Sequence, residues 1–261
     1  MTKKYFKFYL ILIIYSLNIN LILSQGSAGS NYLYESRRIV DFPNAGMLPL
    51  KNLGLDLGYY KYGAISLKGE YSPYYFINIG LSYSGNNIIG LGTIEFQKYP
   101  GISVKFRVTG ESKILPAIAI GFSNQGASNY INDINRFEVL SPGVFMVLSK
   151  SFNWNLGYIG LHTGLNYSFE NNSDERSLNL ILGLEQSIAK FASLNMEYNF
   201  QFDEPDNSIY QARGMLNLSS RISVTNGVTF EIQLRDLLNN SKIDETIERQ
   251  LLFEVIKQIN L

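Results

Sequence analysis

The strongest constraint in this sequence is an alternation of apolar and polar residues that recurs from about residue 50 to the C-terminus. The stretch SLNMEYNFQF (193–202) shows it most clearly, because each polar residue is followed by an apolar one without a break. Successive side chains of a β-strand point to opposite faces, so a period of two predicts a strand with two unlike faces. The sequence therefore predicts an all-β protein, and the question is which strand face meets water.

The alternation delimits twelve candidate strands, each about 8–12 residues long. An even number of strands of this length is typical of a transmembrane barrel. Short and long connections also alternate along the chain, with residues 61–63 as a short exception, as expected when tight turns lie on one side of a membrane and loops on the other. The candidate strands are 54–60, 64–71, 76–84, 102–109, 115–123, 143–152, 158–169, 178–187, 193–202, 210–222, 228–235 and 249–259.

A soluble sandwich or periplasmic barrel, with the apolar faces as its core, is the alternative fold. Charged residues make up only 17% of the chain, against roughly 25% in soluble domains. A soluble sandwich would also have no reason to alternate its turn lengths around the whole chain. We therefore predict a transmembrane, antiparallel, up-and-down β-barrel of about 12 strands in the bacterial outer membrane.

The N-terminus predicts export. Lys3, Lys4 and Lys7 precede a mostly aliphatic stretch at 8–23, the arrangement of a secretory signal peptide, which we assign to residues 1–24. A membrane anchor is the alternative, but polar residues shorten the apolar run below the roughly 20 residues that a helical span needs.

Two further segments follow. Residues 25–50 are irregular and are predicted to lie in the periplasm or to plug the lumen, and residues 51–261 form the predicted barrel.

Charged residues on the candidate strands share one parity. They fall on the polar face, and the apolar face has almost none, with Lys257 near the C-terminus as the exception. A charge facing lipid at the bilayer midplane costs about 2–4 kcal/mol, so the charged face is predicted to line the interior. The predicted interior acids are Asp56, Glu70, Glu185, Glu197, Glu231 and Glu254, and the predicted interior bases are Lys68, Lys105, Arg107, Arg213, Arg221 and Arg235.

These six acids and six bases cancel in charge. An anion pore should show an excess of bases and a cation pore an excess of acids. Balanced charges instead predict an interior network that fills and stiffens the barrel. Lys68 could pair with Asp56, and Glu231 could pair with Arg213 or Arg221. Because twelve strands lie between a filled barrel and an open channel in size, we favour a structural barrel or narrow conduit, with a solute-selective pore as the alternative.

Catalysis has little support in the sequence. His162 is the only histidine, and there is no cysteine. The twelve-stranded outer-membrane phospholipase uses a His and a Ser two residues apart, whereas Gly160 and Gly164 flank His162 at that spacing. We predict a structural or lumen-lining His162, and no catalytic residue, metal or cofactor. A lipid-modifying enzyme is the alternative from another functional class.

Carboxylates offer two further alternatives. Glu185 and Glu197 lie on adjacent candidate strands and could act as a general acid and base, although the interspersed bases favour structural roles. The acidic stretches 174–175 and 203–206 could hold a divalent cation or contact lipopolysaccharide, but such loop tips are usually solvated. Zero net charge argues against a nucleic-acid partner. The expected partners are outer-membrane lipid, lipopolysaccharide and the barrel-assembly machinery.

Three stretches together resemble a known family. RRIVDFPNAGML (37–48) is similar to the Asp-x-Pro-Thr-Ala-Gly segment of a group of bacterial outer-membrane barrels, with Asn44 where Thr is usual. GISVKFRV with LPAIAIGFSNQG (101–126) and SPGVFMVLSKSF with LHTGLNYSFEN (141–171), including Ser149 and Lys150, resemble later segments. The nearest named family is the YjbH-type proteins associated with exopolysaccharide production. The resemblance covers about half the chain. It implies a barrel without catalytic residues and a link to envelope polysaccharide export.

Overall fold

The computed structural model describes residues 35–170, 177–188, 191–204, 209–225, 227–242 and 246–259. The predicted signal peptide and the first part of the irregular N-terminal segment therefore lie outside the described residues, as do Asp174, Glu175 and Asp206.

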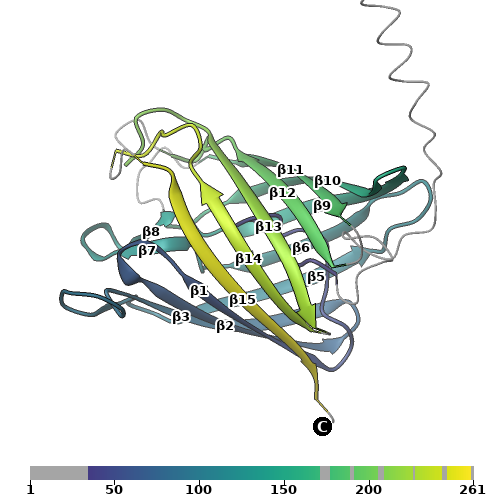
Figure 1. Ribbon diagram of the computed structural model, residues 1–261, viewed down its shortest axis with the longest axis horizontal. Helices are drawn as coiled ribbons and strands as arrows, with labels where there is room; N and C mark the ends of the chain where they lie inside the picture. The colour runs from purple at the N-terminus through teal and green to yellow at the C-terminus, as the bar shows by residue number, and fades with distance from the viewer. Residues whose placement is uncertain are drawn as a thin grey trace, which may run out of the picture.

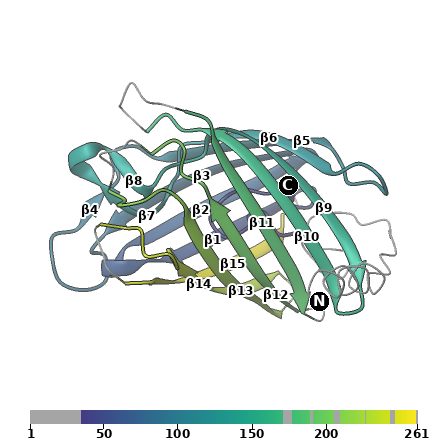
Figure 2. The ribbon, with the colours of Figure 1, turned by 90° about the horizontal axis from the view of Figure 1, so that it is seen from above.

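Twelve antiparallel strands form a closed barrel, as Figures 1 and 2 show from two directions. Each strand pairs with the next barrel strand along the chain, and pairing of β1 with β15 closes the ring. The predicted fold class is thus confirmed. The barrel strands are β1 (Asn52–Tyr59), β2 (Ile65–Tyr74), β3 (Ile77–Asn86), β5 (Gly101–Thr109), β6 (Ala117–Ser123), β9 (Gly143–Trp154), β10 (Gly157–Tyr167), β11 (Asn179–Ile188), β12 (Ala192–Asn199), β13 (Met215–Thr225), β14 (Val228–Arg235) and β15 (Glu248–Gln258).

The connections alternate in length as predicted, with residues 60–64 as the short exception at the long-loop end. At one end, the short-turn end, they comprise residues 75–76, 110–116, 155–156, 189–191 and 226–227. At the other, the long-loop end, they comprise residues 60–64, 87–100, 124–142, 168–178, 200–214 and 236–247. The long connections include η1 (Lys61–Gly63), β4 (Glu95–Phe96), β7 (Ala127–Ile131), η2 (Asn132–Ile134) and β8 (Arg136–Val139).

The exterior of the barrel is apolar over its middle and aromatic towards both ends. Leu55 on β1, Leu161 on β10 and Leu182 on β11 all face outward, and Leu161 is 46% exposed. Exposed aromatic rings at the long-loop end include Tyr59, Tyr83, Phe122, Phe169 and Phe202, and those at the short-turn end include Tyr74, Tyr75, Phe76 and Phe191. An apolar band between two aromatic girdles is the exterior of a membrane-spanning barrel. Among the described residues, no helix is long and apolar enough to span a membrane.

Strand β9 is apolar on both faces, and the sequence alone does not orient it. In the structure, Phe145 and Val147 point inward and are buried, whereas Val144 and Met146 face outward. The physical reason is that this part of the lumen contains an apolar segment of the chain, described below, so apolar residues are buried on the inside as well.

One predicted strand begins later than expected. The alternation suggested a strand from residue 210, but β13 begins at Met215. Gly214 has a φ of 99°, a backbone conformation that interrupts an extended strand. The predicted lumen residue Arg213 therefore lies in the preceding connection and is exposed, which corrects its assignment.

Candidate functional site

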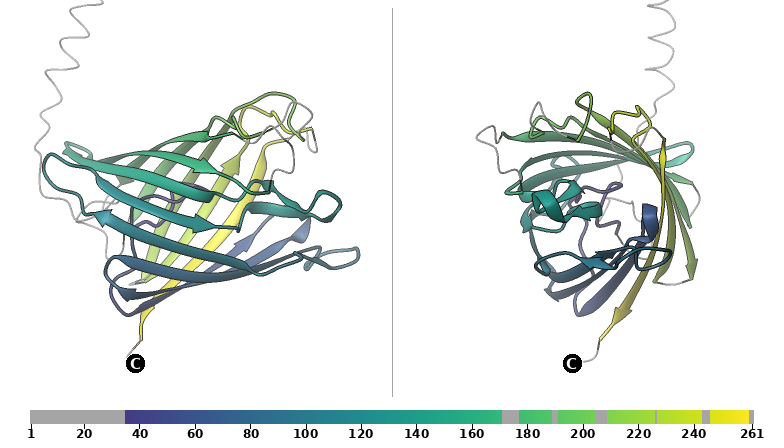
Figure 3. Two further views of the ribbon diagram at one scale, coloured as in Figure 1. Left: turned by 180° about the vertical axis from the view of Figure 1, so that it is seen from behind. Right: turned by 90° about the vertical axis from the view of Figure 1, so that its left-hand side faces the viewer.

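Residues 35–50, here called the N-terminal hairpin, lie inside the barrel except for the exposed Leu50 at their end, and Figure 3 shows them as the darkest segment. The segment folds back on itself. Ile39 N donates to the Phe42 carbonyl at 2.8 Å, and Asn44 N donates to the Arg37 carbonyl at 3.2 Å. These bonds hold the turn, but no residue of the hairpin joins the barrel sheet.

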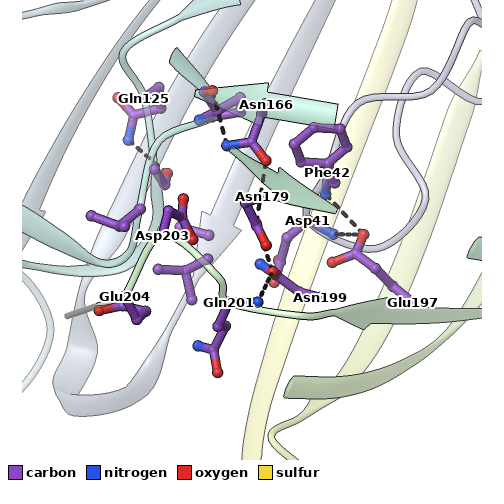
Figure 4. Close-up of a pocket in the computed structure, with 15 residues that line it drawn as sticks. Asp41, Phe42, Gln125, Asn166, Asn179, Glu197, Asn199, Gln201, Asp203 and Glu204 are labelled. Carbon is purple, nitrogen blue, oxygen red and sulfur yellow. Dashed lines mark hydrogen bonds between the residues drawn. The ribbon is translucent and has the colours of Figure 1, made fainter. Parts of the chain in front are cut away.

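Glu197 on β12 binds the turn of the hairpin. A single carboxylate oxygen, Oε2, accepts hydrogen bonds from the backbone N–H groups of Val40, Asp41 and Phe42, at 3.0, 3.0 and 2.9 Å. Figure 4 shows the bonds from Asp41 and Phe42 to Glu197. Successive N–H groups that point into one concavity form an anion-binding nest. The predicted inward Glu197 thus fixes the turn at a defined place in the lumen.

One wall of the lumen is acidic and binds the two arginines of the hairpin. Arg37 Nη2 lies 2.9 Å from Asp56 Oδ1, and Arg38 Nη2 lies 2.9 Å from Glu231 Oε2. Adjacent strands supply the carboxylates, because the β1–β2, β1–β15 and β14–β15 pairs lie side by side. We call this set the arginine pocket, and its residues are Asp56, Glu70, Glu231 and Glu254.

Four of the predicted interior bases donate hydrogen bonds to the hairpin. The pairs are Lys105 with the Arg37 and Asn44 carbonyls at 3.2 Å, Arg107 with the Ala45 carbonyl at 3.0 Å, Arg221 with the Ile39 carbonyl, and Arg235 with the Asp41 carboxylate at 2.7 Å. An irregular segment satisfies only part of its backbone by its own hydrogen bonds, so charged donors from the wall bond further carbonyls.

The opposite wall is apolar and packs against the other face of the hairpin. The buried cluster is Ile39, Phe42, Ala45, Ala117, Ala119, Phe145, Val147 and Ile181. The rings of Phe42 and Phe145 meet edge to face, with their centroids 6.0 Å apart. Glycines make the room: a Cβ at Gly183 would lie 2.6 Å from Ile39 Cδ1, and one at Gly164 would overlap the Phe42 ring.

His162 lies on this side of the lumen and is 4% exposed. Its Nδ1 is 2.9 Å from Ser149 Oγ, which also accepts a hydrogen bond from Ala45 N at 3.1 Å. Its Nε2 is 3.9 Å from Glu185 Oε2. Ser149 is the cross-strand neighbour of His162, a relation that spacing along one strand does not reveal. Ser149 is engaged with the hairpin backbone, so the arrangement fixes the hairpin in place.

Eleven of the twelve predicted interior charges lie on barrel strands, and Arg213 is the exception. Lys68 bonds Glu70 at 2.8 Å instead of Asp56. Arg221 bonds Glu231 at 2.9 Å. The suggested acid–base pair is not assembled, because Glu197 binds the hairpin turn while Glu185 faces His162.

Sequence reasoning missed the charges of the hairpin itself, namely Arg37, Arg38 and Asp41, and also Glu248 on β15. The dense run of charges in RRIVD was the available signal.

The long-loop end forms a mouth above the hairpin, into which the β7–β8 hairpin folds (Figure 3, right). Arg136 bonds Glu204 at 2.6 Å, and Lys61 bonds Glu138 at 2.5 Å. Asp203 and Glu204, the described part of the acidic stretch 203–206, are each only 4% exposed and are therefore not solvated. Burial, together with the charge of Glu204, raises the pKa of Asp203 to about 7. Within the described residues, no three carboxylates or imidazoles converge in a way that could hold a metal ion.

Small polar cavities lie beside the hairpin, and two of them, lined by described residues, are each about 60 Å³, enough for a few water molecules. One lies between the hairpin turn and the mouth, lined by Asn166, Asn179 and Asn199 among others (Figure 4). The other borders the arginine pocket.

Comparisons with known proteins give structural likeness only. No protein-family model matches the chain, and no curated protein matches it. The NanC porin is 10% identical, covers 80% of this chain and 100% of its own, and has a TM-score of 0.41. A triple mutant of the Rhodopseudomonas blastica porin is 12% identical, covers 74% of this chain and 55% of its own, with a TM-score of 0.32. The resemblance to YjbH-type proteins gains no support here.

Proposed function

We propose that this chain is a non-catalytic conduit for small hydrophilic solutes in the bacterial outer membrane, and that the N-terminal hairpin closes it. The observation that supports this proposal best is the position of residues 35–50 in a barrel whose inner wall is polar and charged on one side. A purely structural barrel could fill its interior with its own strand side chains, as eight-stranded barrels do.

The hairpin can leave the lumen without unfolding the barrel. It adds no strand to the sheet, so its withdrawal breaks no strand pairing. The polypeptide chain connects the hairpin to the barrel at residue 51, just before β1. Most of the hairpin's anchors are charged or polar groups that water can solvate after withdrawal, including Glu197, Arg107 and Arg235. Its insertion is therefore a reversible state of the chain.

Two other functions have less support. Lipid hydrolysis would need Ser149 and His162 to meet a lipid, but both side chains are buried inside the barrel beneath Ala45. Polysaccharide export rests on the short sequence resemblance alone, and no contact of the described residues favours it.

Planar-bilayer recording tests the proposal. We would compare the whole chain with a variant in which residues 36–48 are replaced by a Gly/Ser linker of equal length, after checking that both are folded by circular dichroism and heat-modifiable gel migration. We expect the whole chain to stay mostly closed and the folded linker variant to show frequent conductance steps. A folded linker variant that conducts no more than the whole chain would refute the conduit.

A further inference from the structure

We infer that the arginine pocket is a binding site for a small solute with a guanidinium or ammonium group, and that Arg37 of the hairpin occupies it in place of that solute. This inference rests on the proposed conduit and specifies the solute class that it passes.

The first observation is how completely the wall surrounds Arg37. Its side chain is 4% exposed, with Nη2 2.9 Å from Asp56 Oδ1 and Nε 3.1 Å from Glu254 Oε1. Its third nitrogen, Nη1, bonds Glu70. Nε, Nη1 and Nη2 of the guanidinium thus each meet a carboxylate, the arrangement that recognises a planar cation.

The second observation is which bases form ion pairs with each carboxylate of the pocket. Glu70 has Lys68 on its own strand, and Glu231 has Arg221. Within the described part of the chain, Asp56 and Glu254 form ion pairs with hairpin arginines only. Withdrawal of the hairpin removes the arginine partners of Asp56 and Glu254 and opens both carboxylates to the lumen. Two adjacent carboxylates without a paired base form a place where another cation can bind.

The third observation is a space shaped for the guanidinium. Gly54 faces the lumen two residues before Asp56, and a Cβ at Gly54 would lie 3.1–3.2 Å from the Arg37 Nη2, Cζ and Nη1 atoms. Any larger residue would crowd the cation. Gly54, which has no side chain, thus leaves room for the Arg37 guanidinium beside the carboxylates that bind this cation.

The charge of the wall supports the same sign of solute. Inward-facing acids on the strands are Asp56, Glu70, Glu185, Glu197, Glu231, Glu248 and Glu254, and inward-facing bases are Lys68, Lys105, Arg107, Arg221 and Arg235. The wall therefore has two more acids than bases. Lys105, one of these bases, interacts electrostatically with Glu70 and is already included in the count. The hairpin itself is neutral, with Glu35 and Asp41 offsetting its two arginines. An acidic excess favours cations in a pore.

The test uses the linker variant in bilayers with a KCl gradient. We expect a several-fold preference for K⁺ over Cl⁻ and a concentration-dependent block of the current by added L-arginine amide, but not by glucose. Adding Asp56→Asn and Glu254→Gln should reduce both effects. Glu185→Gln, on the wall that does not touch Arg37, should change the selectivity less and leave the block in place.

The outcomes separate the two proposals. If the linker variant does not conduct, the conduit itself is refuted. If it conducts without cation preference and without block by L-arginine amide, the conduit stands and the cation site is refuted. Because the block is measured on the linker variant alone, this decision does not depend on the folding of the substituted forms.

Discussion

Glu197 illustrates how far sequence reasoning reaches at the scale of a residue. The alternation in 193–202 places its carboxylate inside the barrel, and it is 1% exposed there. The sequence could not name its partners, because they are backbone N–H groups of Val40, Asp41 and Phe42, more than 150 positions away in the chain. Backbone donors are the same in every non-proline residue, so no residue type marks the nest.

Gly183 gives a prediction at the same scale. Gly183→Leu should force the hairpin out, because its Cβ would already lie 2.6 Å from Ile39. Overpacking of this kind costs about 1–3 kcal/mol. If the whole of this cost destabilises the inserted state of the hairpin, the fraction of molecules with the hairpin withdrawn should rise by about 5- to 150-fold. Trypsin should then cleave faster after Arg37, which is buried in the closed state.

The matched control is Gly69→Leu on β2. A Cβ at Gly69 would meet nothing closer than Leu55 at 3.5 Å, on the outer surface. This variant should be cleaved at the wild-type rate. Equal protection of Arg37 in both variants would contradict the packing described for Ile39.

At the scale of the element, the alternation predicted the strands closely, whereas for residues 25–50 it left a periplasmic position and a lumen plug both open. A strand with lipid on one face and a polar interior on the other must alternate apolar and polar residues, so the sequence indicates where each strand lies and which face points inward. The N-terminal hairpin meets an acidic wall on one side and an apolar wall on the other, so its side chains follow no regular period. Strand β9 had no clear period for the related reason that Phe145 and Val147 pack against this hairpin.

The outward face of the strands gives a prediction at this scale. Leu182→Arg, near the middle of β11, should destabilise the folded barrel in lipid by about 2–4 kcal/mol, because the charge would face the bilayer core. Leu115→Arg, the same change in the turn between β5 and β6, should cost about 0–1 kcal/mol. Urea unfolding in liposomes measures both. Equal free energies of unfolding would contradict a membrane-embedded exterior.

For the whole molecule, the number of strands was predicted from the sequence, but the net charge of the lumen was not. Six predicted acids and six predicted bases suggested a neutral lumen, and two assignments changed that balance. Arg213 lies outside the barrel strands, and Glu248 belongs to the inner wall. The strand count was predictable because alternation and turn length both report it. The sequence left open whether residues 25–50 lie in the periplasm or plug the lumen, because this segment has no alternation that would place it and its residues 35–50 share no strand pairing with the barrel.

The most direct test of the closed lumen uses the absence of cysteine from the chain. Ala45 N lies 3.1 Å from Ser149 Oγ, so Ala45→Cys with Ser149→Cys places two thiols on neighbouring residues of the hairpin and the wall, and oxidation is used to join them. Formation of the bond would be checked by mass spectrometry, and single-channel openings would be counted in one bilayer before and after reduction. We predict almost no openings while the bond is intact, and openings after reduction at the frequency of the Ser149→Cys single variant. Equal conductance before and after reduction would contradict closure by the N-terminal hairpin.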